Sequence, residues 1–206
     1  ALTVSGSGTT YTAYNNITAN GIVIETNVTI ALGASIQFSQ GSVGVFTMNS
    51  GSSITGGSNY TLTIISSNDS VASTLRTITI AGALSLNRSM QTATFNTIAG
   101  TTITSGNFTL GTATLNLSGN LSCANFSAAG GNTVNVTGSP TITASGNWDT
   151  TSGIFNAAGA LITISGSFTG GFTSNTSTVT FAGTNTLNLV GSGQYPSYSF
   201  NILNLG

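Results

Sequence analysis

The residues that could carry enzyme chemistry are few in this chain. The 206 residues include three carboxylates and two cations, namely Glu25, Asp69, Asp149, Arg76 and Arg88, and no histidine. A glycosidase needs two carboxylates that face each other across the bond it breaks. Because the three carboxylates are far apart in the sequence, we predict that the protein is not an enzyme.

The sequence also contains few residues that could bind a metal or act as a nucleophile. Metal sites are built from His, Cys or clustered Asp and Glu, and the only cysteine, Cys123, has no histidine to activate it. We therefore expect no cofactor, no metal, and a Cys123 that is a buried small apolar residue. A net charge of −1 offers no attraction to nucleic acid. No apolar run reaches the roughly 18 residues of a transmembrane helix, so we expect no membrane insertion.

The chemical motif that does recur is Asn-X-Ser/Thr, the acceptor of N-linked glycans. Ser and Thr make up about a third of the chain, so many matches arise from composition alone. If the source glycosylates its proteins, exposed loop sites are the best carriers. The candidates are Asn16, Asn27, Asn59, Asn68, Asn87, Asn107, Asn125 and Asn175.

The elements that would position these side chains follow a repeat of about twenty residues. TFNTIAG at 94–100 returns as TLNLSG, TVNVTG and IFNAAG, with central asparagines Asn96, Asn116, Asn135 and Asn156. A second marker, ITSGNF at 103–108, returns as LSCANF, ITASGNW and ITISGSF, with aromatic residues Phe108, Phe126, Trp148 and Phe168. Two independent markers with nearly the same step indicate a structural repeat.

Within each copy, apolar and polar residues alternate, which is typical of half-buried strands separated by glycine turns. Three short strands in about twenty residues match one coil of a parallel β-solenoid, whose coils lie about 4.8 Å apart. The aromatic residues should then stack inside or at a corner, and the asparagines should form an outward ladder. We predict an all-β protein, a parallel β-solenoid with coils of about 18–21 residues that is clearest in 77–190. The alternative is a β-sandwich completed by a neighbour's strand.

The strand pattern and its register are less clear in the first part of the chain, so we divide the chain after residue 76. Residues 77–206 are assigned to solenoid repeats. Residues 1–76 form a less regular β region, either irregular coils of the same solenoid or a separate small β unit.

The motifs SGNWDTTSGIFNAAG and STVTFAGTNTLNL also resemble the "beta strand repeat" segments of large bacterial and archaeal surface and secreted proteins. The resemblance covers about residues 77–190. It implies a right-handed parallel β-helix in a structural or adhesive protein that is secreted or displayed on the cell surface.

Low charge on a soluble protein favours association. The terminal segments are strand-like and uncharged, so we expect a homopolymeric filament, fibre or surface layer that assembles through them. The residues expected at the joints are Leu2, Val4, Phe200, Ile202, Leu203 and Leu205. The alternatives are an adhesin or carbohydrate-binding β-helix with surface glycans as partners, and an ice-binding solenoid.

The ice-binding alternative depends on Thr-X-Thr pairs. These occur at residues 77/79, 92/94, 102/104, 112/114, 141/143 and 178/180. Their spacing along the chain is irregular, so we predict that they do not fall in one column of a twenty-residue coil.

Overall fold

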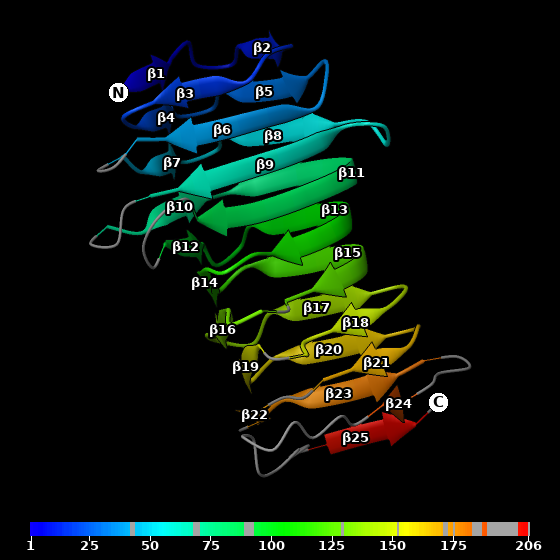
Figure 1. Ribbon diagram of the computed structural model, residues 1–206. Coiled ribbons are helices and arrows are strands. Elements are labelled where there is room, and N and C mark those ends of the chain that lie inside the picture. Colours follow the sequence, from blue (N-terminus) through cyan, green and yellow to red (C-terminus); the bar gives the residue numbers. More distant parts are fainter. Residues whose placement is uncertain are drawn as a thin grey trace.

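A computed structural model describes residues 1–41, 44–67, 71–88, 93–128, 130–151, 153–170, 173–174, 176–182, 187–188 and 202–205. The protein is all-β, a parallel β-solenoid of about eight turns with a repeat of about 21 residues. The strands stack in coil order from β1 to β25 (Figure 1). The predicted solenoid is therefore confirmed, and the β-sandwich alternative is not what the chain forms.

Each coil contributes strands to three faces, which we call face 1, face 2 and face 3. Face 1 contains β1 (Leu2–Val4), β4 (Ile22–Ile24), β7 (Phe46–Met48), β10 (Ser73–Leu75), β12 (Thr94–Thr97), β14 (Thr114–Leu117), β16 (Thr133–Val136), β19 (Ile154–Ala158) and β22 (Thr173–Ser174).

Faces 2 and 3 together form a second sheet, because three long strands bend from one face to the other. Face 2 contains β2 (Thr10–Ala13), β5 (Thr29–Leu32), β8 (Ser53–Gly56), the first halves of β11 (Thr77–Arg88), β13 (Thr102–Leu110) and β15 (Asn120–Ser127), then β17 (Thr141–Ala144), β20 (Leu161–Ile164), β23 (Thr178–Phe181) and β25 (Ile202–Leu205). Face 3 contains β3 (Ile17–Ala19), β6 (Ile36–Gln40), β9 (Thr61–Ser66), the second halves of β11, β13 and β15, then β18 (Trp148–Asp149), β21 (Phe168–Thr169) and β24 (Leu187–Asn188).

The pairings are parallel on all three faces, as in β14 with β16 on face 1, β17 with β20 on face 2 and β3 with β6 on face 3. The sheets run without a break across residue 76, since β7 pairs with β10 and both β8 and β9 pair with β11. The strands before Thr77 thus lie in the same two sheets as those after it.

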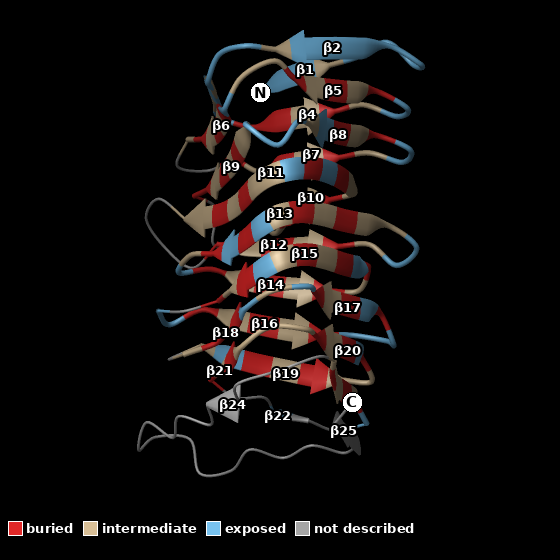
Figure 2. Cartoon of the chain, turned by 90° about the vertical axis from the view of Figure 1, so that its right-hand side faces the viewer, coloured by how far each residue is buried: buried red, intermediate tan, exposed pale blue. Residues whose placement is uncertain are grey.

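The strands whose side chains the structure describes turn alternate side chains inward, and these side chains form one continuous apolar core. The banding of buried and half-buried residues along the strands is visible in Figure 2. A rung of three short strands cannot bury its apolar face alone, so each coil depends on the coils above and below it. Among the described residues there is no helix, and hence none that is long and apolar enough to cross a membrane.

The glycine of the SGN motif is required by the corner between faces 2 and 3. A Cβ atom on Gly106 would lie 2.4 Å from the carbonyl oxygen of Ala81, and one on Gly82 would lie 2.0 Å from that of Tyr60. Consecutive coils therefore approach too closely for a side chain at Gly82 and Gly106, which favours glycine at this corner, although Ala124 takes the equivalent place on the next coil.

Candidate functional site

The described carboxylates do not form a catalytic pair. Glu25 follows β4 on the second coil, whereas Asp149 lies in β18 on the seventh. Five strand spacings of about 4.8 Å put them roughly 24 Å apart along the axis. Each has a local structural partner: Asn49 Nδ2 donates to Glu25 Oε2 at 2.9 Å, and the Thr151 N–H donates to Asp149 Oδ1 at 2.8 Å. Asp69 lies outside the described residues.

The remaining reactive groups are also engaged in the scaffold. The Arg76 Nε donates to the Met48 carbonyl at 3.3 Å, and the Arg88 Nε donates to Thr112 Oγ1 at 2.9 Å. Cys123 is a free cysteine and only 3% exposed, and burial raises the pKa of its thiol to about 12. No group of three His, Cys, Asp or Glu that could hold a metal occurs in the described part of the chain.

The structure places the four aromatic residues in one buried column on face 3. Phe108 stacks on Phe126 with ring centroids 5.4 Å apart, and Phe126 stacks on Trp148 at 4.1 Å. Trp148 is in turn the register partner of Phe168. All four side chains are at most 1% exposed, so the column lies inside the solenoid.

The four asparagines of face 1 form a continuous amide ladder. Asn116 Nδ2 donates to Asn96 Oδ1 at 2.8 Å, and Asn135 Nδ2 donates to Asn116 Oδ1 at 3.2 Å. Asn156 Nδ2 then donates to Asn135 Oδ1 at 2.7 Å. These half-buried side chains point outward from successive strands of face 1, and their hydrogen bonds join each coil to the next.

A second asparagine ladder, which the sequence reasoning missed, follows the corner between faces 2 and 3. Asn125 Nδ2 donates to Asn107 Oδ1, and the Asn147 N–H donates to Asn125 Oδ1, both at 2.8 Å. The Ser167 N–H donates to Asn147 Oδ1 at 3.1 Å. The signal was the Asn before the aromatic residue of the repeated ITSGNF motif, whose Oδ1 accepts a hydrogen bond from the next coil.

The candidate glycan acceptors occupy different environments. Asn16, Asn59, Asn107 and Asn125 are exposed, whereas Asn87 is half-buried and donates from Nδ2 to Ser85 Oγ at 2.8 Å. Asn27 is exposed in a turn with a φ of 58°, a left-handed conformation that asparagine tolerates better than most residues. Asn68 and Asn175 lie outside the described residues.

The outward side of face 2 corrects the prediction about the Thr-X-Thr pairs. Pairs 77/79, 102/104, 141/143 and 178/180 all lie on face 2 in two shared columns. The prediction was wrong because turns of different length change the step along the chain without changing the register of the strands. Ile78 pairs with Ile103, twenty-five residues later, whereas Ile162 pairs with Val179, seventeen residues later.

We call these two columns the threonine face. The first column is Thr10, Thr29, Ser53, Thr77, Thr102, Asn120, Thr141, Leu161 and Thr178, and the second is Thr12, Ala31, Thr55, Thr79, Thr104, Ser122, Thr143, Thr163 and Thr180. Thirteen of these eighteen outward positions are threonine and none is charged. The pairs at 92/94 and 112/114 do not belong to it, because Thr94 and Thr114 start strands of face 1 and Thr92 is outside the described residues.

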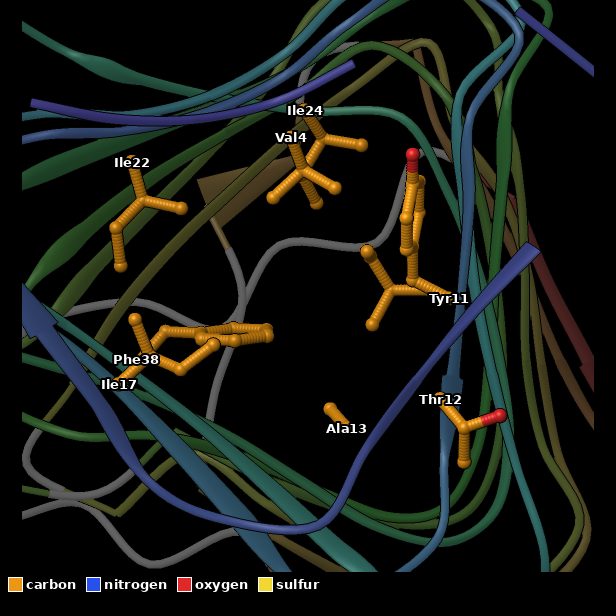
Figure 3. A pocket seen from close by; sticks show the side chains of 9 residues that line it. Val4, Tyr11, Thr12, Ala13, Ile17, Ile22, Ile24 and Phe38 are labelled. Carbon is orange, nitrogen blue, oxygen red and sulfur yellow. The ribbon is translucent and has the colours of Figure 1, made fainter. Parts of the chain in front are cut away.

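The outer edge of the first coil is unpaired among the described residues, and apolar groups are exposed there. Leu2 and Tyr11 occupy inward positions of their strands, yet they are 37% and 41% exposed, and Val4 is half-buried. Below them is an apolar cavity of about 200 Å³. Its lining comes from the first two coils and is drawn in Figure 3: Val4, Tyr11, Thr12, Ala13, Ile17, Ile22, Ile24, Ile30 and Phe38.

The other expected assembly residues lie near the opposite end. Ile202, Leu203 and Leu205 belong to β25, which pairs with β23 so that Leu203 is the register partner of Val179. Phe200 lies outside the described residues.

No family model, no curated protein and no solved structure matches this sequence. The fold and its surfaces define the protein by class, as a parallel β-solenoid with an asparagine ladder on face 1, a second ladder at the corner between faces 2 and 3, and the threonine face on face 2.

Proposed function

We propose that this protein is an extracellular structural subunit that stacks end to end on further copies of itself. The observation that carries the proposal is the open first coil. Strands β1, β2 and β3 each pair on one edge only among the described residues, with β4, β5 and β6 respectively. An unpaired strand edge is a template for another strand, and none of these three carries a Lys or Pro that would block it.

A second copy offers a strand of the matching direction and register. Tyr11 begins a face 2 column that continues through Ile30 and every later coil to Leu203. Stacking β2 of one copy on β25 of another would extend this column with unchanged strand direction. The added coil would also cover Tyr11 and the cavity beneath it. Identical head-to-tail contacts that do not close into a ring produce a filament.

The extracellular location is part of the proposal and is supported by three features. The charge is very low, the Asn-X-Ser/Thr motifs are frequent, and the repeats resemble those of secreted and surface proteins. A rod with so few charges is suited to a filament, fibre or surface layer, where stacking rather than charge provides cohesion.

The test uses proline on the open edges. The N–H groups of Thr29 and Gly33 donate to the carbonyls of Thr9 and Ala13, so these odd-numbered residues of the first coil face β5. Alternate residues of a parallel strand use opposite edges. Thr12 therefore directs its N–H to the open edge, and Thr12→Pro removes that donor without removing a bond to β5.

Thr3 is equivalent on β1, because Leu2 and Val4 bond to the neighbouring coil. We expect the intact protein to form rods in negative-stain images and to sediment as a polymer. The double variant Thr3→Pro/Thr12→Pro should stay monomeric. The matched control, Thr3→Val/Thr12→Val, keeps both N–H groups and should polymerise. The proposal fails if the intact protein is monomeric at every concentration, which is the result expected if a different coil of a longer protein covers this edge. It also fails if the proline variant polymerises normally.

A further inference from the structure

The threonine face has a chemistry that end-to-end stacking does not use. Its two columns run along the solenoid, whereas the proposed joints lie at the two ends. Outward residues on one strand are about 6.6 Å apart, and the same position on the next coil is about 4.8 Å away. The face is thus a two-dimensional lattice of side chains, and thirteen of its eighteen positions carry both a hydroxyl and a methyl group.

The lattice is held by a rigid layer beneath it. The inward residues between the two columns are buried from Ile30 to Val179, none more than 5% exposed. They are Ile30, Ile54, Ile78, Ile103, Leu121, Ile142, Ile162 and Val179. Branched side chains have few rotamers, and threonine in a strand is restricted at χ1, so the hydroxyl and methyl groups keep a fixed pattern.

The composition of the face narrows the class of ligand. No charged side chain is present to bind a mineral, a phosphate or an acidic polymer. No aromatic ring lies among the eighteen outward positions to stack against a sugar. Regularly spaced hydroxyl and methyl groups can instead hold water in a repeating arrangement, in which the methyl groups order the water between them and the hydroxyls hydrogen-bond to it.

We propose that the threonine face binds the surface of ice. The spacing of the coils is close to the a-axis repeat of hexagonal ice, and the array extends over nine successive strands of face 2. Ordered waters on the face therefore match the crystal over a wide area. Leu161, which is 52% exposed, Ala31 and Asn120 interrupt the hydroxyl pattern but not its spacing. Many weak contacts on one rigid surface make binding to a crystal lattice effectively permanent.

The test compares substitutions on two faces. Thr79 and Thr104 are register partners near the middle of the threonine face. Thr79→Lys and Thr104→Lys each place a long charged side chain in the lattice. The matched control is Thr109→Lys, an exposed outward residue of β13 on face 3. Circular dichroism of each variant checks that the fold is kept.

Ice crystals in buffer are the probe, with crystal shape, thermal hysteresis and partition of fluorescently labelled protein into growing ice as measurements. We expect the intact protein and Thr109→Lys to shape crystals and enter the ice. Both face 2 variants should fall to the level of buffer alone. The Thr3→Pro variant alters β1 on face 1 and leaves the threonine face unchanged. It should retain ice binding whether or not it polymerises, which separates this inference from the assembly proposal. The inference is overturned if the intact protein has no effect on ice, or if the control loses as much ice binding as the face 2 variants. It is also overturned if the intact protein binds crystalline cellulose or chitin and the face 2 substitutions abolish that binding instead.

Discussion

Removing the indole of Trp148 tests the aromatic column most severely. Trp148 is 1% exposed and stacks on Phe126 at 4.1 Å with an interplanar angle of 18°. It also meets Phe155 edge-on, with centroids 5.1 Å apart. Phe155 belongs to face 1 and Trp148 to face 3, so the indole packs strands of two faces together.

The expected loss follows from these contacts. Trp→Ala in a core costs about 3–5 kcal/mol, and aromatic pairs add about 0.5–1.5 kcal/mol each beyond the area they bury. Trp148→Ala should therefore reach the upper part of that range, about 4–5 kcal/mol. The cavity cannot close easily, because the hydrogen-bonded coils on either side fix the distance between Phe126 and Phe168.

Equilibrium urea unfolding followed by circular dichroism measures the change, since Trp148 is the chain's one tryptophan and its fluorescence is lost with it. The control is Trp148→Phe, which restores the aromatic type found above and below it and should lose less than half as much. A loss under about 1 kcal/mol for Trp148→Ala would refute the reasoning, because only a surface residue behaves in that way.

Three further predictions concern the other columns and the surface. Asn116→Ala removes one donated and one accepted hydrogen bond of the amide ladder, so it should lower the free energy of unfolding by about 1–2 kcal/mol in urea titrations. The control, Thr114→Ala on the same strand, should lower it less. An equal loss in the two variants would show that the ladder adds no stability. The Cys123 thiol, with its pKa raised to about 12, should resist alkylation at pH 8 until the protein unfolds. The unfolded thiol has a pKa of about 8.5 and ionises before the buried one, so the free energy of unfolding should fall between about pH 8.5 and 12. The Cys123→Ala variant should lack this contribution to the pH dependence. In a glycosylating host, mass spectrometry should find Asn59 occupied, but never Asn107 and Asn125 on one molecule, because these two are register partners joined by a hydrogen bond.

The features that the sequence predicted correctly are those in which the same residue type returns at nearly the same step. Asn96, Asn116 and Asn135 mark one outward column, and their neighbouring apolar residues mark the inward one. The alternation around them was enough to predict a parallel β-solenoid. Local pattern and global fold agree in this part of the chain.

The threonine face could not be recognised by spacing because the coils differ in length. Inserted residues lie in the turns, where they leave the strand pairing intact. Ile54 and Ile78 are twenty-four residues apart and Leu121 and Ile142 twenty-one, yet all lie in one column. An alignment on the Thr-apolar-Thr pattern, with turns of free length, would have found the column.

The second asparagine ladder was hidden for another reason. Asn107 and Asn125 each match the glycosylation motif, and that motif alone can explain why an asparagine occurs at these positions. Their role in bonding coil to coil depends on the close approach of consecutive coils at Gly106 and Gly146. That approach is a property of the stacked fold, which no single copy of the motif contains.

Electron cryo-microscopy of the intact protein tests the central claim most directly, namely that the solenoid continues from one copy into the next. About eight turns spaced by about 4.8 Å make a subunit of roughly 40 Å along the axis. We predict straight rods many times this length whose images show a repeat of about 4.8 Å along the rod. Particles of one subunit's length at every concentration, or filaments in which the strand spacing runs across the axis, would contradict the account.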